Sequence, residues 1–478
     1  MNSNETICAL ATAPGGALGI IRVSGPQSLE ILSRVFRGKG DVQTYLPNTI
    51  HYGHIISPLP LEGTGLAPVI DEVMVSIFRA PHSYTGEDSV EISCHGSRYI
   101  YNKVLELLIQ NGCRMANPGE FTQRAYLNGK MDLSQAEAVA DLIASTNKAT
   151  HNIALSQLRG QFSSELSILR DQLLKLTSLL ELELDFSDHE DLEFADRTEL
   201  LSIAQTIDNR ITRLAQSFET GQALKQGIPV AIVGKTNVGK STLLNTLLKD
   251  DRAIVSDIHG TTRDTIEDTI DINGITFRFI DTAGIRQTQD EVEQIGISRT
   301  FAAIDKARIV LWLIDSLPSN KEVQEMQERC KDKSLIITIN KMDKLNDEST
   351  QELSAFLSPL TPHLLTISAK YGTHISELES AIYESANIPT LTESDVIVTN
   401  ARHYDALLRA HEHLQRVIEG MGAKMVNGQW SMVNESLSGD LLSEDLRLTL
   451  DTLAEITGGQ ITPNEVLGNI FSHFCVGK

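Results

Sequence analysis

The residues with the clearest chemical signature form a glycine-rich segment in the middle of the chain. Residues 234–241 read Gly-Lys-Thr-Asn-Val-Gly-Lys-Ser, which matches the pattern G-x-x-x-x-G-K-[ST]. The glycines let backbone N–H groups surround phosphate oxygens, Lys240 can reach β- and γ-phosphates, and the Ser241 hydroxyl can bind Mg²⁺. The segment follows an apolar run at 228–233 and precedes an apolar helical pattern from Leu243. The sequence therefore predicts the strand, loop and helix that this motif requires.

Three more short motifs each follow a predicted strand, and the last two of them recognise the base. They are Asp281-Thr282-Ala283-Gly284, Asn340-Lys341-Met342-Asp343 and Ser368-Ala369-Lys370. Asp281 can approach the magnesium shell, and the Gly284 amide can approach the γ-phosphate. Asp343 can accept hydrogen bonds from N1 and the 2-amino group of guanine, and adenine lacks that amino group. We therefore predict a GTP-binding, doubly wound α/β domain with its ligand at the carboxyl ends of the strands.

The water-orienting glutamine of Ras-type enzymes is missing from its usual place. Ile285 follows the Asp281–Gly284 motif, and its apolar side chain cannot orient a water molecule. The acidic run at 290–293 supplies carboxylates nearby, and Arg263 and Arg286 are candidates for an arginine finger in cis. Asn237 suggests another device, because its carbonyl could help to bind a monovalent cation against the phosphates. It could equally stabilise the turn of the loop, and the chemistry of the residue favours neither interpretation.

The overall composition sets limits on partners and location. The 41 basic and 63 acidic residues give a net charge of −22, so the molecule as a whole repels phosphate backbones. Any contact with nucleic acid must use a local basic patch or be made by a partner. No stretch approaches the roughly 20 apolar residues of a membrane helix. The five cysteines are scattered without a CxxC pair, which indicates a reducing cytoplasm.

Hydrophobic patterns divide the chain into three kinds of segment. Residues 1–130 are rich in Gly and Pro with short β-like runs, which predicts an α+β domain. Helical spacing begins near Leu133 and returns after residue 389. Strand–loop–helix alternation fills residues 228–388, so we predict an α/β domain inserted into a helical domain made of 131–227 and 389–478. The expected buried faces are Ala136, Val139, Ala140 and Ile143; Leu166, Leu169, Leu173, Leu176, Leu180 and Leu184; and Tyr404, Leu407, Leu408, His411, Leu414 and Val417.

Several motifs outside the phosphate loop carry a resemblance to one family. These are Tyr84-Thr85-Gly86-Glu87-Asp88, Asn128-Gly129-Lys130-Met131-Asp132-Leu133, Gly260-Thr261-Thr262-Arg263-Asp264 and the terminal Phe474-Cys475-Val476-Gly477-Lys478. Over essentially all 478 residues, the chain resembles the MnmE (TrmE) family of bacterial and organellar tRNA-modification GTPases. The terminal Cys-Val-Gly-Lys has valine where the family commonly has isoleucine.

The resemblance implies a fold and a reaction. It implies an N-terminal folate-binding and dimerising domain, a central helical domain and an inserted Ras-like G domain. The family works as a homodimer in a heterotetramer with an FAD-dependent partner, MnmG. That complex adds an aminomethyl or carboxymethylaminomethyl group at C5 of the wobble uridine of certain tRNAs, with a carbon from a tetrahydrofolate derivative (5-formyl- or methylene-tetrahydrofolate). GTP hydrolysis in the family uses Mg²⁺, is stimulated by K⁺ and accompanies dimerisation of the G domains.

The resemblance also assigns roles to residues. It implies Mg²⁺ binding by Ser241 and Thr262, and K⁺ binding by the side chains of Asn237 and Thr261 and the carbonyls of Ser256 and Ile258. Glu293 would position the attacking water, and Cys475 would be a possible reactive thiol. Folate would contact Arg22, Glu87, Lys130 and Lys478. The expected GTP contacts are Asn237, Val238, Gly239, Lys240, Ser241, Thr242, Ser256, Asp257, Ile258, His259, Gly260, Thr261, Thr262, Asp281, Thr282, Ala283, Gly284, Asn340, Lys341, Asp343, Ser368, Ala369 and Lys370.

Two other functions share parts of this pattern. A molecular switch, such as a ribosome-assembly GTPase, shares the G-domain motifs, but such proteins usually carry an RNA-binding module with a basic face. The net charge of −22 without a basic cluster argues against such a module. A folate-dependent one-carbon transferase that its G domain merely regulates is the third possibility. Folate binding that does not depend on tRNA would support it.

Overall fold

The described residues of the computed structural model form two compact units. They are residues 5–57, 68–185, 197–250, 268–280, 301–389, 395–426, 429–432, 439–459, 467, 470–472, 474 and 477. The first unit draws on Met1–Ile143, Leu155–Asn209 and Ala406–Lys478, and the second on Ala144–Ala154 and Arg210–Asp405. Among the described residues, no helix is both long enough and apolar enough to cross a membrane.

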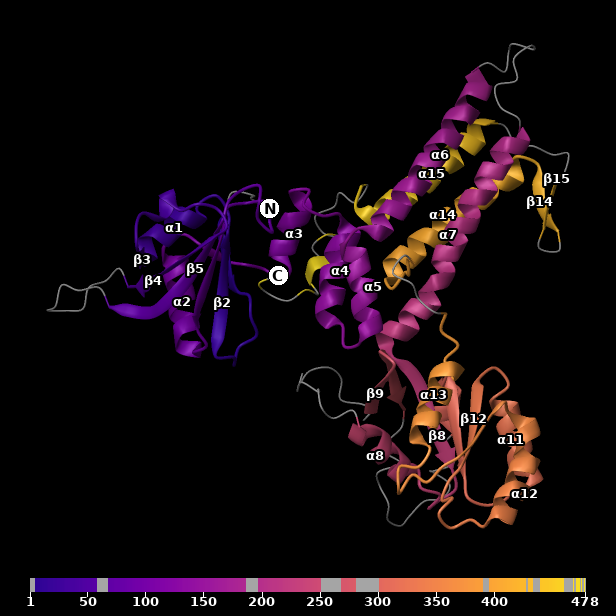
Figure 1. Ribbon diagram of the computed structural model, residues 1–478. Helices are drawn as coiled ribbons and strands as arrows, with labels where there is room; N and C mark the ends of the chain where they lie inside the picture. The colour runs from indigo at the N-terminus through magenta and orange to yellow at the C-terminus, as the bar shows by residue number, and fades with distance from the viewer. Residues whose placement is uncertain are drawn as a thin grey trace. The chain divides into compact units, whose positions relative to one another are not determined.

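The first unit contains a seven-stranded sheet in the order β3-β4-β5-β6-β2-β1-β7. Its strands are β1 (Ile7–Leu10), β2 (Leu18–Ser24), β3 (Phe36–Gly38), β4 (Thr49–Ile56), β5 (Val69–Phe78), β6 (Ser89–His95) and β7 (Arg114–Met115). All neighbours pair antiparallel except β1 with β7. Helices α1 (Ser28–Val35) and α2 (Arg98–Gln110) contribute buried side chains to one core with the strands, and Figure 1 shows them beside the sheet. This is the predicted α+β pattern.

Long helices make up most of the remaining first unit. The helices are α3 (Glu120–Leu127), α4 (Leu133–Ala144), α5 (Lys148–Leu158), α6 (Gln161–Asp185), α7 (Arg197–Gln226), α14 (Ala401–Gly420) and α15 (Gly439–Thr457), with a hairpin of β14 (Ala423–Val426) and β15 (Gln429–Met432). The carboxyl-terminal part of α7 and the amino-terminal parts of α5 and α14 belong to the second unit. Arg447 Nη2 donates to Glu181 Oε1 at 2.7 Å and joins α15 to α6.

The predicted buried faces of these helices are confirmed in large part. Leu166, Leu169, Leu173, Leu176 and Leu180 are buried along α6, as the leucine spacing predicts. The predictions were wrong for Ile143 and Leu408, which are 45% and 37% exposed. For α4, the reason is that Leu133 and Ala136 form its buried face by packing with Leu467 and Phe471.

The second unit contains a six-stranded sheet in the order β13-β12-β11-β8-β10-β9. Its strands are β8 (Ile228–Gly234), β9 (Asp268–Ile272), β10 (Ile275–Phe279), β11 (Ile309–Ile314), β12 (Ser334–Ile339) and β13 (His363–Thr366). Every neighbouring pair is parallel except β9 with β10. The carboxyl ends of β8, β11, β12 and β13 therefore lie at one edge of the sheet, which is where a doubly wound fold binds its ligand.

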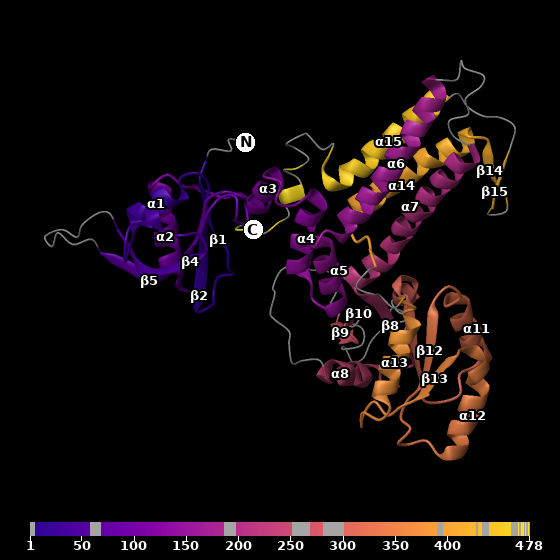
Figure 2. The ribbon, with the colours of Figure 1, turned by 45° about the horizontal axis from the view of Figure 1, so that its top comes forward.

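Helices cover both faces of this sheet. They are α8 (Lys240–Asp250), α11 (Asn320–Arg329), α12 (Asp347–Leu357) and α13 (Ile375–Ser385). Buried residues of α8 and α13 share one core cluster, and those of α11 and α12 share the other. Figure 2 shows the two pairs on opposite sides of the strands. Together with the parallel strands, this arrangement confirms the predicted doubly wound α/β unit.

The start of α5 packs on the β9–β10 hairpin, which the sequence did not indicate. Asn147 Nδ2 donates to Thr276 Oγ1 at 2.8 Å, and the Ala149 N–H donates to the Gly274 carbonyl at 3.0 Å. Ala149 and Ile153 also pack against the core of the second unit. Residues 144–154 therefore join the α/β unit although they lie about 80 residues before it in the sequence. The three-domain boundaries at 130, 227 and 388 stay predictions.

Candidate functional site

The phosphate-loop motif lies between β8 and α8, at the carboxyl edge of the sheet. β8 ends at Gly234 and α8 begins at Lys240. Gly234 has φ +152°, and a Cβ there would lie 2.4 Å from the Leu313 carbonyl oxygen. Gly239 has φ +105°, and its Cβ would lie 2.3 Å from Asn340 Nδ2. Both positions therefore require glycine, because the backbone conformation and the lack of space each exclude a side chain.

Lys240 is held in this loop by main-chain carbonyls. Its Nζ donates to the carbonyl of Gly234 at 2.7 Å and to that of Lys235 at 2.8 Å. Burial lowers the pKa of this ammonium group, because desolvation disfavours the charged form. A phosphate group beside it would supply a counter-charge. Ser241 follows at the start of α8, where a hydroxyl oxygen is a suitable ligand for the hard cation Mg²⁺.

Asn237 lies in the left-handed region, with φ +62°. Asparagine tolerates this conformation better than most residues, so the turn alone gives one physical reason for asparagine at this position. The geometry thus supports the turn interpretation and leaves the cation role as a proposal. A glycine would adopt the same backbone conformation without the carboxamide.

Asn340 links the phosphate loop to the loop after β13. The side chain is 2% exposed. Its Nδ2 donates to the Val238 carbonyl at 2.8 Å, and its Oδ1 accepts from the Ala369 N–H at 3.0 Å. Thr246 on α8 also donates to the Ala369 carbonyl, at 2.8 Å. Three of the predicted motifs are therefore brought together and fixed relative to one another by buried hydrogen bonds.

The base-recognition residues have partners that orient them. The Ser368 hydroxyl donates to Asp343 Oδ1 at 2.7 Å. This hydrogen bond lowers the pKa of the Asp343 carboxyl, so that the exposed group is an ionised acceptor at neutral pH. Lys341 Nζ donates to Asp315 Oδ2 at 2.6 Å. Sequence reasoning missed Asp315 and Thr246; Asp315 could have been found as the acidic residue directly after the apolar strand β11.

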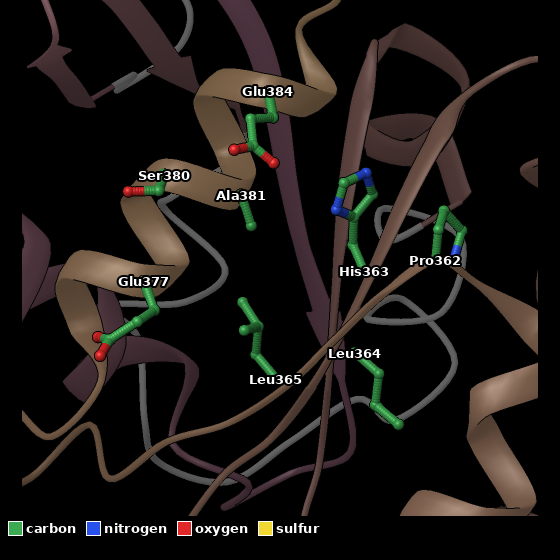
Figure 3. Close-up of a pocket in the computed structure, with 8 residues that line it drawn as sticks. All are labelled: Pro362, His363, Leu364, Leu365, Glu377, Ser380, Ala381 and Glu384. Carbon is green, nitrogen blue, oxygen red and sulfur yellow. The ribbon is translucent and has the colours of Figure 1, made fainter.

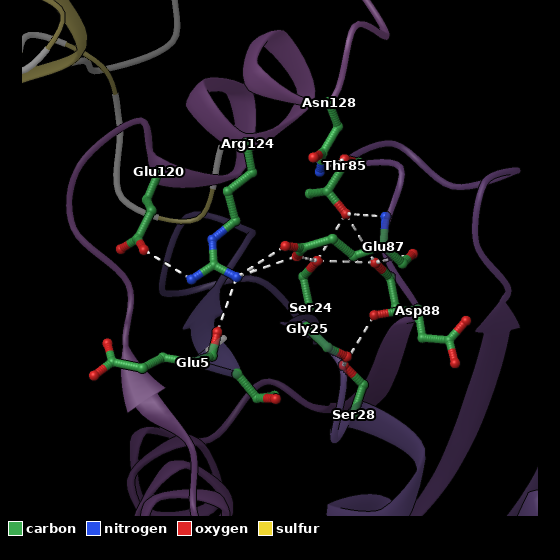
Figure 4. Close-up of polar contacts among 12 residues, drawn as sticks. Glu5, Ser24, Gly25, Ser28, Thr85, Glu87, Asp88, Glu120, Arg124 and Asn128 are labelled. Carbon is green, nitrogen blue, oxygen red and sulfur yellow. Dashed lines mark hydrogen bonds and ion pairs between the residues drawn. The ribbon is translucent and has the colours of Figure 1, made fainter. Parts of the chain in front are cut away.

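The N-terminal residues predicted for folate lie in one polar region of the first unit. Arg22 on β2 donates through Nη2 to Glu91 Oε1 at 2.7 Å, and its guanidinium lies 5.4 Å from the centre of the Tyr84 ring. Glu87 is bound by Ser24 and Arg124, as Figure 4 shows. Lys130 Nζ donates to the Pro81 carbonyl at 3.0 Å.

The end of the chain also reaches this region. Arg22 Nη1 lies within hydrogen-bond distance of the Gly477 carbonyl, at 3.4 Å. A Cβ on Gly477 would lie 2.3 Å from the Leu10 carbonyl oxygen, so the tail contacts β1 closely at this point. Lys478 itself lies outside the described residues.

Comparison with known proteins covers the whole chain. The profile of the TrmE N-terminus, named for a GTP-binding protein, matches residues 6–130, and that of the MnmE helical domain matches residues 133–475. The tRNA modification GTPase MnmE of Phocaeicola vulgatus is 53% identical over 100% of both chains, and that of Bacteroides thetaiotaomicron is 53% identical over 100% of both. The chain belongs to the MnmE family of tRNA modification GTPases.

As a member of the MnmE family, the protein is a GTP hydrolase. The phosphate loop and the base-recognition residues at the carboxyl edge of the sheet in the second unit accord with this activity. The MnmE of Christiangramia forsetii is 49% identical, again over 100% of both chains. Among solved structures, the elongation factor SelB of Methanococcus maripaludis with a GTP analogue has a TM-score of 0.27 and 18% identity over 34% of this chain and 35% of its own. That likeness is too low to add to the argument.

Part of the predicted MnmE site lies outside the described residues. The predicted residues concerned are Ser256, Asp257, Ile258, His259, Gly260, Thr261, Thr262, Asp281, Thr282, Ala283, Gly284, Glu293 and Cys475, together with the candidate arginines Arg263 and Arg286. The roles of these residues stay predictions. The nucleotide residues that the structure does describe lie at the carboxyl edge of the sheet or at the start of α8.

A shallow groove of about 270 Å³ lies elsewhere in the second unit. Figure 3 shows His363, Leu364 and Leu365 of β13 on one side of it and residues of α13 on the other. It begins at the amino end of β13, whereas Ser368 and Ala369 follow the carboxyl end of that strand. No predicted site residue lines this groove, so it is not part of the nucleotide site.

Proposed function

We propose that this protein uses GTP hydrolysis to support modification of the wobble uridine of certain tRNAs at C5. In this proposal it works in the cytoplasm as a homodimer with the FAD-dependent protein MnmG and takes a one-carbon unit from a tetrahydrofolate derivative. The full-length similarity to tRNA modification GTPases carries the proposal. The net charge of −22 favours recognition of tRNA through the partner.

The proposed hydrolysis uses cations bound around the phosphate loop. Ser241 and Thr262 would hold Mg²⁺, and Asn237, Thr261, Ser256 and Ile258 would hold K⁺. The described part of this set fits, because Ser241 offers a hydroxyl oxygen at the start of α8 beside the glycine-lined loop. The cations would neutralise charge that develops on the phosphates. Lys240 binds the phosphates, Asp343 selects guanine, and Glu293 positions the attacking water.

The proposed folate site uses Arg22, Glu87, Lys130 and Lys478. The contacts of Arg22 with Gly477 and of Lys130 with the loop that carries Glu87 support the grouping. Homodimerisation through the N-terminal sheet is supported by exposed apolar side chains on its face opposite α1 and α2. Tyr52 on β4 pairs with Met74 on β5, and these side chains are 57% and 48% exposed. Such a patch is typical of an interaction surface.

Nucleoside analysis of tRNA tests the proposed reaction. Purified protein, a flavoprotein partner, unmodified tRNA, GTP, methylene-tetrahydrofolate and an amine should together give C5-modified wobble uridine, measured by mass spectrometry. The amine is ammonium for the aminomethyl group and glycine for the carboxymethylaminomethyl group, and it supplies the nitrogen that the folate carbon lacks. Omission of the folate or of GTP should abolish the product. In the same reaction, the Asp343→Asn variant should give the product only when xanthosine triphosphate replaces GTP. The reason is that this substitution changes the preferred base from guanine to xanthine. Normal GTP turnover without any modified uridine would favour the molecular-switch alternative, and folate chemistry without tRNA would favour the one-carbon transferase.

A further inference from the structure

The side chain of Asn147 bonds to the start of α5 and to the β9–β10 hairpin at the same time. Asn147 is 8% exposed. Its Oδ1 accepts from the Thr150 N–H at 2.8 Å, which satisfies one of the free donors in the first turn of α5. Its Nδ2 donates to Thr276 Oγ1 on β10 at 2.8 Å. One buried carboxamide therefore caps the helix and ties it to the hairpin.

The turn of the hairpin fits closely against the same part of α5. The turn is formed by Asn273 and Gly274 with φ +55° and +81°, as the tightest hairpin connections require. The Gly274 carbonyl accepts from the Ala149 N–H at 3.0 Å. A Cβ on Gly274 would lie 3.0 Å from Lys148 Cβ. A displacement of the turn would break these contacts unless α5 moved with it.

The sheet holds the opposite end of the hairpin. β10 runs parallel to β8 and pairs with it over Phe277–Phe279, whereas β9 is the edge strand and pairs with β10. The carboxyl end of β10 therefore lies at the nucleotide edge of the sheet. Thr276 and the turn lie beyond the pairing with β8, at the other edge, and α5 contacts them there (Figure 2).

The hairpin also lies between two predicted phosphate motifs in the sequence. Thr262, which would bind Mg²⁺, precedes β9, and Asp281 follows β10 closely. In GTPases the γ-phosphate and its Mg²⁺ order the segments that contact them, and hydrolysis releases those segments. Both outer ends of the hairpin thus lead toward the nucleotide, while its turn contacts α5. The hairpin is placed to carry a change from one edge of the sheet to the other.

We propose that the bond between Asn147 and Thr276 couples the nucleotide state of the second unit to α5. This helix begins among the residues of the second unit and continues after Ala154 into those of the first. Among the described residues, the hydrogen bonds of Asn147 go to α5 and to Thr276, so Asn147 acts on the helix and not on hydrolysis. The inference needs GTP binding alone and goes beyond the proposed chemistry on tRNA and folate.

Hydrogen exchange in the full-length protein tests this coupling. Exchange of the α5 amides and of the hairpin amides is followed by mass spectrometry with GDP and with a non-hydrolysable GTP analogue. In the wild type, the exchange rates of α5 should differ by about fivefold between the two states, within the range of couplings between sites. Coupling exists only where a contact differs between the states, so the comparison of the two nucleotides is the decisive one.

Two substitutions remove the bond from either side. Asn147→Ser keeps an oxygen that can cap α5 but is too short to reach Thr276. Thr276→Val removes the hydroxyl and keeps a β-branched side chain suited to a strand. In each variant the α5 difference should fall below about twofold because the coupling is lost, while the hairpin amides keep their difference. The double variant should lose no more than either single one, since both remove the same bond.

Thr269→Val is the matched control, because it makes the same substitution at an exposed position on β9, the other strand of the hairpin. It should keep the wild-type difference in α5. GTP turnover of all variants should stay within about twofold of wild type, as expected for residues distant from the phosphates. A wild type without a nucleotide-dependent difference in α5, or a difference that survives both substitutions, would overturn the inference. Faster α5 exchange by the same factor in both nucleotide states would also overturn it, because Asn147 would then only hold the helix start. If Asn147→Ser does not fold, Thr276→Val decides.

Discussion

Replacement of Lys240 by methionine should lower the rate of GTP hydrolysis by about 1,000-fold, the loss expected when a preorganised charge on the transferred phosphate is removed. Methionine has an unbranched, uncharged side chain that is one heavy atom shorter, so the substitution removes the ammonium group and keeps an apolar stem of similar size. That group now bonds to two carbonyls in the loop, and burial lowers its pKa. The ligand-free protein should therefore unfold at the same temperature or slightly higher, since a partly buried charge is removed.

Lys235→Met provides the control for Lys240→Met. Lys235 lies in the same loop, but its side chain is 59% exposed and pairs with Glu322 at 3.0 Å. An exposed pair of this kind contributes little, so turnover should stay within about threefold of wild type. Single-turnover hydrolysis and thermal unfolding of both variants provide the measurement. Equal losses in the two variants would contradict the role given to Lys240.

Replacement of Asp343 by asparagine should change the preferred nucleotide from GTP to xanthosine triphosphate. The carboxylate accepts from N1 and the 2-amino group of guanine, and an amide cannot accept both bonds. Affinity for GTP should fall by roughly 100-fold, because two charge-assisted bonds are lost and one donor is left facing another. Xanthine carries a carbonyl in place of the amino group, and the amide of asparagine can donate to it. Competition binding with the two nucleotides measures the change.

Ser368→Ala separates the orientation of Asp343 from its charge. It removes the hydroxyl that donates to Asp343 Oδ1 and keeps the carboxylate. GTP affinity should fall by only about fivefold, in the range of a single hydrogen bond, and affinity for xanthosine triphosphate should not rise. An unchanged preference for GTP in Asp343→Asn would show that the base is recognised elsewhere.

The nucleotide site was predictable because its signals are local. The motif of the phosphate loop includes glycine at fixed positions. In the structure, a Cβ on Gly234 or on Gly239 would clash with a neighbouring atom, so both positions need glycine. The motifs at 340–343 and 368–370 each follow an apolar strand, and parallel strands bring their carboxyl ends to one edge. The leucine stripe of α6 was predictable for the same reason, since its spacing directly reflects the helix period.

Contacts between residues far apart in the sequence were not predictable. Ile143 was expected on the buried face of α4. The buried face is instead the one that packs against Leu467 and Phe471, which lie more than 300 residues later in the sequence. The Arg124–Glu120 pair is spaced i,i+4 and would be taken for an exposed salt bridge, whereas both side chains are buried. Only the folded structure shows that Arg124 of this pair also binds the Glu87 carboxylate. The contact of Asn147 with Thr276 was missed for the same reason.

GTP turnover in potassium and in sodium at equal ionic strength tests the central claim most directly, that hydrolysis depends on a cation held by this loop. Asn237→Gly and Glu293→Ala are measured beside the wild type. Glycine suits φ +62° and keeps the turn, so this variant removes the carboxamide alone. We expect fast turnover only in potassium, and its loss in both variants. Equal wild-type rates in the two salts, or potassium stimulation that survives Asn237→Gly, would contradict the account and leave Asn237 a turn residue.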